Sequence, residues 1–264
     1  MDTFVPAATF DPQLFKGSTL ILPSVSIGNV PQLTCDLLIH TLKLERCGFI
    51  EDNAVMPVAG GREEGQPVGI AVPVEVFQSE DHRWTVIQQR APTFRDKRQQ
   101  FINNLVTFVE RYQFSNVILL TSMDATRRLD VQINSMPFRL LSNPSTNAVA
   151  ERAQALGVSY LENVEKTAEQ ETGKKGIPAL PGAGIARPLF ARLAETNVPT
   201  TLFLIFALEG AYLFQDNVPD SIQFVNMLNT VLELKSAKDT LTSWTPPKSW
   251  EYLFGTPFNA ELYQ

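Results

Sequence analysis

Residues 19–31 read Thr19-Leu20-Ile21-Leu22-Pro23-Ser24-Val25-Ser26-Ile27-Gly28-Asn29-Val30-Pro31. The apolar run at the front, which Pro23 closes, predicts a buried strand. Gly28-Asn29 is a turn sequence, and Pro31 stands where a first-turn helix residue would, with Asn29 as a candidate cap. Leucines then recur at helical spacing. The stretch to about residue 45 therefore predicts a strand–turn–helix unit, which typically opens an α/β domain.

The same alternation continues downstream. Val68–Phe77 and Trp84–Gln88 predict a hairpin, in which Pro73 favours an edge position. Arg95–Tyr112 carries one apolar face at helical spacing, and Val117–Leu120 is a fully apolar run suited to the centre of a sheet. A strand, a helix and a strand at this spacing predict a parallel pair with a right-handed crossover.

Four later segments complete the pattern. Phe138–Leu141 predicts a short strand, and a glycine turn at Leu180–Ile185 leads into a helix at Pro188–Thr196. Thr200–Ala207 is apolar on both faces and predicts a buried strand, followed by a helix at Ser221–Ser236. We expect an α/β fold: a three-layer αβα sandwich with a mostly parallel central sheet, plus a C-terminal helical region and an extended tail.

The domain organisation follows from composition. Residues 1–243 are expected to form a single α/β domain, interrupted by a charged loop at about residues 162–176. Residues 244–264 form a different segment, in which prolines stand beside tryptophans, tyrosines and phenylalanines. So dense a proline content excludes an ordinary helix. We expect the aromatic rings to pack back on the domain and to leave only the last few residues free.

Charge and composition exclude several classes of protein. The net charge of −6 and the pI near 5.1 argue against a binder of nucleic acid or of acidic membranes. No apolar run approaches 18 residues, and the N-terminus lacks the basic region of a signal peptide. Two cysteines and two histidines are too few for a disulfide framework or a zinc site. We expect an intracellular protein without a cofactor.

The side chains that most often perform catalysis do not form a recognisable pattern. Cys35 lies on the apolar face of the first predicted helix and is expected in the core. His40 near the end of that helix is expected to be structural or exposed, and His82 in a turn is expected to be solvated. No sequence signature of a hydrolase, metalloprotease or redox enzyme is present. We therefore predict no catalytic, cofactor-binding or metal-binding residue and favour a binding protein.

Four polar clusters nevertheless stay open as alternatives. The turns at Ser24–Asn29 and Leu180–Ile185 each precede a helix and could bind an anion. Arg127-Arg128 with Asp130 follows a buried strand, the usual position of binding sites in open α/β sheets. The carboxylates that could form an acid/base pair lie near the end of the last strand: Glu209, Asp216 and Asp220.

The chain ends in Leu262-Tyr263-Gln264. Leu262 can fill an apolar dimple, while the ring of Tyr263 packs and its hydroxyl seeks a hydrogen-bond partner. The terminal carboxylate can be held by backbone N–H groups or by a lysine in a receiving pocket. This hydrophobic-Tyr-X ending is our candidate partner-binding site.

Several segments together resemble the proteasome assembly chaperone 2 family, eukaryotic members of a wider α/β family with archaeal relatives. The similarity covers nearly the whole chain, and the common order of the segments makes it specific. They are Leu22–Val30 leading to Gln32-Leu33, Pro137-Phe138-Arg139, Pro181–Ile185, Glu209-Gly210 with Asn217–Asp220, and Pro247–Gly255.

The resemblance implies a non-catalytic chaperone that pairs with proteasome assembly chaperone 1. The heterodimer would sit on the proteasome α-ring during assembly of the 20S core particle, in the cytoplasm and nucleus. Fungal members of the family end in a hydrophobic-Tyr-X tail that enters a pocket between neighbouring α subunits. Leu262, Tyr263 and Gln264 match that ending position by position.

Two other functions remain possible on the residues alone. One is an enzyme on a nucleoside-phosphorylase-like scaffold, with the two turns as its anion site. The other is a dimerising scaffold unrelated to the proteasome, in which the tail packs on its own domain.

Overall fold

The computed structural model describes residues 3–62, 69–144, 147–162, 176–208, 217–235 and 243–252, apart from the side chains of residues 251 and 252. Among these residues, nine strands form one sheet in the order β1-β3-β6-β7-β2-β8-β11-β9-β10. The strands are β1 Phe4–Pro6, β2 Thr19–Pro23, β3 Glu45–Ile50, β6 Val74–Gln78, β7 Trp84–Gln89, β8 Asn116–Asp124, β9 Phe138–Asn143, β10 Ser159–Tyr160 and β11 Thr200–Ala207. A separate two-stranded sheet pairs β4 Gly60–Gly61 with β5 Ile70–Ala71.

The centre of the large sheet is parallel and joins an antiparallel strand on each side, while the edge strand β10 pairs in parallel with β9. Strand β2 pairs in parallel with both β7 and β8, and β8 pairs in parallel with β11 over its full length. Strands β1, β3 and β6 continue from β7 in antiparallel pairs, whereas β9 runs antiparallel to β11 at the other side. The central strands are apolar because helices cover both of their faces.

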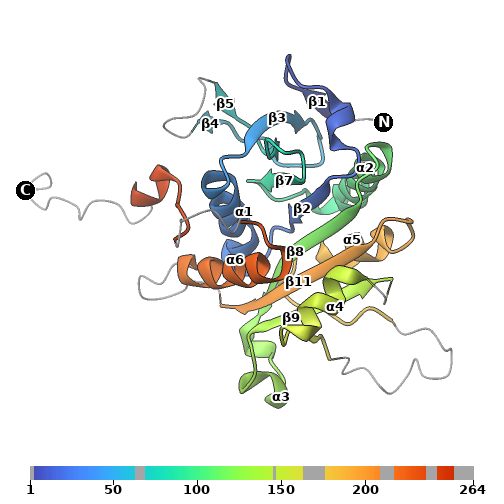
Figure 1. Cartoon of the computed structure of the whole chain (residues 1–264), viewed down its shortest axis with the longest axis vertical. Helices are drawn as coiled ribbons and strands as arrows, with labels where there is room; N and C mark the ends of the chain where they lie inside the picture. The colour runs from blue at the N-terminus through green and yellow to red at the C-terminus, as the bar shows by residue number, and fades with distance from the viewer. Residues whose placement is uncertain are drawn as a thin grey trace, which may run out of the picture.

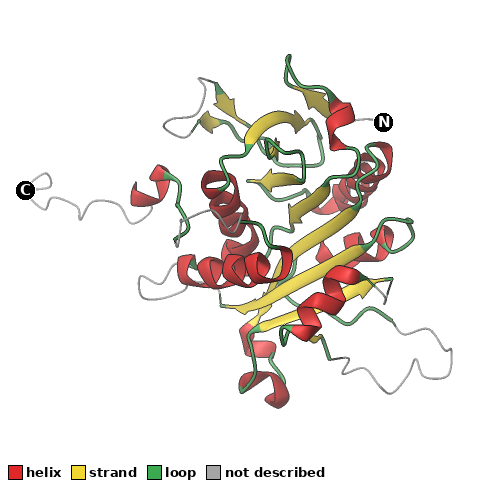
Figure 2. Ribbon diagram, viewed as in Figure 1, coloured by secondary structure: helices red, strands yellow, loops and turns green. Residues whose placement is uncertain are grey.

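Helices cover the two faces of the sheet and complete three layers (Figures 1 and 2). The helices α2 Arg98–Arg111 and α5 Ala186–Leu193 pack on one face, and α1 Val30–Thr41, α4 Ala148–Ala155 and α6 Val218–Leu232 pack on the other. The short helix α3 Asp130–Ile133 lies beyond the lower end of the sheet in Figure 1. The expected α/β sandwich is thus confirmed.

Short 3-10 helices connect or extend these elements. They are η1 Pro12–Phe15, η2 Ile27–Asn29, η3 Arg95–Lys97, η4 Ala125–Arg127 and η5 Lys248–Tyr252. The predicted helix at Arg95–Tyr112 therefore consists of η3 followed by α2, and its expected apolar side chains are buried. The helix predicted from Pro188 begins two residues earlier, and the one predicted from Ser221 begins at Val218.

Each face of the sheet has its own core. On the α2 side, an aromatic cluster forms around Phe15, whose ring centroid lies 5.2 Å from that of Phe4 and 5.7 Å from that of Phe108. On the α6 side, Phe138 stacks on Phe224 with ring centroids 6.1 Å apart. The first cluster joins β1 and η1 to α2, so burial of aromatic area fixes the N-terminal segment on the sheet.

The expected edge position of Pro73 is wrong. Strand β6 lies between β3 and β7, inside the sheet. The proline directly precedes the first residue of the strand, and its carbonyl accepts a hydrogen bond from the backbone N–H of Arg90 at 2.8 Å. A proline at the start of a strand removes no donor from the ladder, so it is compatible with an interior strand.

Most of the charged loop predicted at residues 162–176 and the end of the tail lie outside the described residues. Among the helices that are described, none combines the length and apolarity needed to cross a membrane.

Candidate functional site

The tail residues Leu262, Tyr263 and Gln264 lie outside the described residues, so their role stays a prediction. The structure describes the base of the tail. The indole N–H of Trp244 donates to Oδ1 of Asn226 on α6 at 2.7 Å, and the ammonium of Lys235 lies 3.9 Å from the centroid of the Trp244 ring. The backbone N–H of Thr245 donates to Oγ1 of Thr41 at the end of α1 at 2.9 Å. The segment is therefore attached to both helices.

Trp250 completes this attachment. It lies in η5, is 9% exposed and belongs to the core on the α1 and α6 side of the sheet. The expected packing of the tail rings on the domain thus holds for the two tryptophans in the described part. The 12 residues after Tyr252 can span at most about 40 Å when fully extended. The base therefore sets the region that the chain end can reach.

The two glycine-containing turns meet at the carboxyl ends of the parallel strands. The backbone N–H of Ile27 donates to the carbonyl of Gly182 at 2.9 Å, and Oγ of Ser24 donates to the carbonyl of Ala183 at 2.9 Å. Gly184 has φ +60°, and a Cβ added there would lie 2.0 Å from the carbonyl oxygen of Val25. Only glycine allows the two turns to approach this closely.

Strand β8 supplies further partners to these turns. The Oγ atoms of Ser26 and Ser122 lie 2.8 Å apart, and the backbone N–H of Ser122 donates to Oγ of Ser26 at 3.0 Å. Oγ of Ser122 also donates to the carbonyl of Ile27 at 2.5 Å, and the N–H of Asp124 donates to the carbonyl of Pro181 at 3.0 Å. No local pattern in the sequence indicates that Ser122 belongs to this junction, since its partners are about 95 residues away.

Several donors at this junction are therefore used within the protein. An anion site needs N–H and O–H groups that point at the ligand. Here the hydroxyls of Ser24 and Ser122 and the N–H of Ile27 donate to backbone carbonyls instead. This arrangement favours a structural junction between the turns over the anion site considered above.

Arg128, which follows β8, and Arg139 in β9 both lie over the ring of Phe206 in β11. The guanidinium carbon of Arg128 lies 4.8 Å from the ring centroid of Phe206 near the end of β11, and that of Arg139 lies 5.8 Å from the same centroid. Partial desolvation, together with the charge of Arg139, lowers the pKa of Arg128. Partial burial raises the pKa of Asp220, although the charge of Arg128 opposes this shift. Glu209 and Asp216, the other two carboxylates of the suggested acid/base group, lie outside the described residues.

Arg139 in β9 forms hydrogen bonds with several neighbouring segments. It is 2% exposed, and its Nε lies 3.1 Å from both carboxylate oxygens of Glu162. Its Nη1 donates to the carbonyls of Met136 and Phe138, and its Nη2 donates to Oγ of Ser135 at 2.7 Å. The segment between α3 and β9 is therefore fixed to the sheet.

Glu162 also accepts a hydrogen bond from Nε2 of Gln132 in α3 at 2.5 Å. Partial burial raises the pKa of Glu162, but the hydrogen bonds from Arg139 and Gln132 outweigh this effect and lower it. Sequence reasoning placed Glu162 in the charged loop and gave Arg139 no role. Only the fold brings these three side chains together.

Both cysteine thiols are buried, which makes them poor nucleophiles. Cys35 is fully buried, as expected, and burial raises the pKa of the Cys35 and Cys47 thiols. His82 is exposed, as expected, and its Nδ1 lies 3.0 Å from Oε1 of Gln78. No cluster of three or more acidic, histidine or cysteine side chains suits a metal ion in the described ranges.

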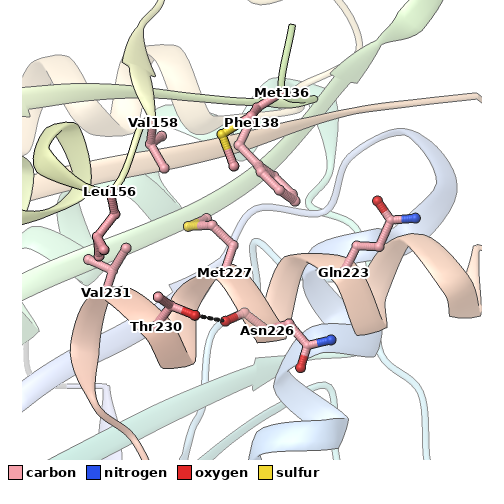
Figure 3. A pocket seen from close by; sticks show the side chains of 9 residues that line it. All are labelled: Met136, Phe138, Leu156, Val158, Gln223, Asn226, Met227, Thr230 and Val231. Atoms are coloured by element: carbon pink, nitrogen blue, oxygen red, sulfur yellow. Dashed lines mark hydrogen bonds between the residues drawn. The ribbon is translucent and has the colours of Figure 1, made fainter.

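A groove lies on the α6 side of the molecule (Figure 3). Its volume is about 300 Å³. It is lined by Met136, Phe138, Leu156, Val158, Gln223, Asn226, Met227, Thr230 and Val231. The sequence did not reveal it, because its residues come from three separate segments.

Comparison with known proteins assigns the chain to a family. The sequence model of the PAC2 family matches residues 20–241. The chain belongs to the PAC2 family. The matched residues include both turns, the Arg139 cluster and the groove, and they end before Trp244. The predicted tail site therefore lies outside the part that defines the PAC2 family.

Curated PAC2-family relatives match over most of their length. The chain is 32% identical to proteasome assembly chaperone 2 of Danio rerio, covering 92% of this chain and 93% of that protein. It is 33% identical to proteasome assembly chaperone 2 of Nematostella vectensis, covering 90% and 98%. The resemblance to the proteasome assembly chaperone 2 family is thus confirmed.

The fold recurs in solved structures. PbaA of Pyrococcus furiosus, titled an archaeal homolog of proteasome-assembly chaperone, superposes with a TM-score of 0.61 at 13% identity, covering 85% of each chain. At this identity the likeness concerns the fold alone.

Proposed function

We propose that this chain is a non-catalytic chaperone that promotes assembly of the proteasome core particle. It acts as a heterodimer with proteasome assembly chaperone 1 and docks on the α-ring, with Leu262-Tyr263-Gln264 in a pocket between two α subunits. The observation that carries the proposal is the match to proteasome assembly chaperone 2 over more than 90% of both chains. This role places the protein in the cytoplasm and the nucleus.

The attachment of the tail base supports the docking step. Burial of Leu262 and Tyr263 with a charge-assisted contact to the terminal carboxylate contributes a few kcal/mol each before ordering costs. A three-residue end of this kind binds weakly alone. Attached to the folded domain through Trp244 and Trp250, it acts at a high effective concentration once another part of the heterodimer is bound.

The test is a quantitative pull-down of α-ring or core particle by this chain, co-expressed with proteasome assembly chaperone 1. Tyr263→Ala and deletion of residues 262–264 should weaken binding about 10- to 1,000-fold, with unchanged thermal unfolding. Addition of one alanine after Gln264 should weaken it similarly, because the carboxylate moves out of register. Gln264→Ala is the matched control and should bind normally, since this position accepts any residue.

The outcomes separate the parts of the proposal. Normal binding by Tyr263→Ala would keep a chaperone and remove the tail contact. Absence of binding by the unaltered heterodimer would refute the proposal as a whole. The enzyme alternative is tested by adding millimolar phosphate or nucleoside and measuring the melting temperature. Because Ser24 Oγ and the N–H of Ile27 already donate to backbone carbonyls, we expect no shift.

A further inference from the structure

We propose that the groove between α6 and the β9–α4 side of the sheet binds the partner chaperone of the heterodimer. This inference rests on the proposed function and assigns that function a surface. None of the nine lining residues is charged, although the chain has a net charge of −6. Uncharged apolar side chains of another protein are the occupant that matches such a lining.

One wall of the groove is a face of α6 that the described part of the chain leaves uncovered. Gln223, Asn226, Met227, Thr230 and Val231 follow the spacing i, i+3, i+4, i+7 and i+8 along α6. Figure 3 shows the side chains of Met227 and Val231 pointing across the hollow towards Phe138 and Leu156, whereas that of Asn226 points away from it. A volume of about 300 Å³ equals the liquid volume of roughly ten water molecules. Several apolar side chains of a partner can therefore enter.

Large apolar side chains are exposed at the mouth of the groove and on α3. Met136 is 45% exposed and Leu156 is 42% exposed, and both line the groove. Val131 and Ile133 on α3 are 65% and 57% exposed. Helix α3 lies at the same end of the molecule as β9 (Figure 1). Exposed apolar side chains gathered on neighbouring elements are typical of protein-binding surfaces.

Charge is confined to the ends of α6. Asp220 lies in its first turn, and Glu233 at its end pairs with Arg152 at 2.5 Å. An uncharged centre with a charged rim is the usual arrangement of a protein–protein interface. Because Arg152 and Glu233 neutralise each other, this rim offers little attraction to a strongly charged ligand. The charge pattern thus favours a folded protein partner over nucleic acid.

The groove and the tail base lie on opposite sides of α6. Figure 1 shows η5 on one side of this helix and β9 with α3 on the other. Asn226 marks the boundary, since it lines the groove and also binds the indole of Trp244. The chain can therefore hold a partner in the groove while its tail reaches another protein. This separation favours the partner chaperone, rather than the α-ring, as the occupant.

The test introduces charge into the groove of the full-length chain. Met136→Glu combined with Leu156→Glu should weaken binding to purified proteasome assembly chaperone 1 about 100-fold or more, measured by titration calorimetry. Met56→Glu combined with Leu14→Glu is the matched control, because these residues are 42% and 37% exposed outside the groove. The control should bind normally. Circular dichroism and thermal unfolding confirm that each variant is folded.

Gln223→Arg provides an independent test if the double variant does not fold, since Gln223 is exposed on α6. It should also weaken partner binding. Normal partner binding by a folded groove variant would overturn the inference, as would loss of α-ring binding with partner affinity intact. Disruption of a homodimer of this chain, without effect on the partner, would overturn it in favour of self-association. If the unaltered chain does not bind the partner, the proposed function itself fails.

Discussion

The Cα of Gly184 lies so close to the carbonyl oxygen of Val25 that a Cβ would approach this oxygen to 2.0 Å. This contact joins the turn after β2 to the turn before α5, about 160 residues apart in the sequence. The hydrogen bonds from Ser24 and Ile27 to the second turn depend on the same approach. A loop junction therefore occupies the carboxyl ends of the central strands, where many α/β proteins bind ligands.

Gly184→Ala is expected to destabilise the protein by about 3–5 kcal/mol. The alanine would have to adopt a left-handed backbone conformation, and its Cβ would clash with the carbonyl oxygen of Val25. Gly17→Ala is the control, because Gly17 has φ +80° but open space around its Cβ position. It should cost only about 1–2 kcal/mol. Urea unfolding measures both. Equal losses of stability in the two variants would show that the two turns can move apart without an energetic penalty.

The sequence predicted the elements whose apolar pattern is uniform. Thr19–Pro23 and Thr200–Ala207 are apolar on both faces because helices cover both sides of the sheet there. The short strand β1 and the mixed strand Glu45–Ile50 were not predicted, since neither has a clear period. The antiparallel direction of β9 was also missed, because strand direction is not encoded locally.

The candidate sites also differ in how far each can be predicted from the sequence. The tail ending is contiguous and could be recognised by its residues, although its contacts remain a prediction. The groove joins Met136, Leu156 and α6, which the fold brings together from distant segments. Likewise, Arg139 and Glu162 are 23 residues apart, and each alone resembles an ordinary charged residue. Sites built by tertiary packing leave little local signal.

Arg139→Met should destabilise the protein by about 2–4 kcal/mol. Breaking a buried ion pair usually costs roughly 3–5 kcal/mol. The loss should be somewhat smaller here because the side chain of Glu162 is 32% exposed and can be hydrated. Hydrogen exchange should also rise in residues 129–136, which the guanidinium holds to the sheet. Arg152→Met is the control at an exposed pair and should leave stability nearly unchanged. Unaltered exchange in Arg139→Met would contradict this role.

Acidification should remove the contribution of Glu162 to the stability of the folded protein. Burial raises its pKa, but hydrogen bonds from Arg139 and Gln132 hold it below the ordinary 4.5, so the unfolded chain takes up the proton first. The stability difference between the unaltered protein and Glu162→Gln should be constant near neutral pH. It should shrink as pH falls below about 4.5. Urea unfolding from pH 7 to 3.5 measures this difference.

For Glu75→Gln, the stability difference from the unaltered protein should change with pH in the opposite direction. Burial raises the pKa of Glu75 and outweighs the effect of Arg46, whose Nε lies 2.9 Å from the carboxylate. The folded protein then takes up this proton first. The unaltered protein should gain stability relative to Glu75→Gln as pH falls towards about 4.5. If both variants gave the same trend, the assigned pKa directions would be wrong.

Trp250→Ala should weaken α-ring binding less than about twofold. Loss of this anchor lengthens the segment between the last attached residue and Tyr263 from about 13 to about 18 residues, because Thr245 stays bound to Thr41, and effective concentration falls with roughly the −3/2 power of length. Trp84→Ala is the control, because Trp84 is 8% exposed, compared with 9% for Trp250, but lies in β7, far from the tail in sequence. Pull-downs at a temperature where both variants are folded should show the loss for Trp250→Ala alone. A loss as large as that of Tyr263→Ala would mean that the anchored segment itself contacts the ring.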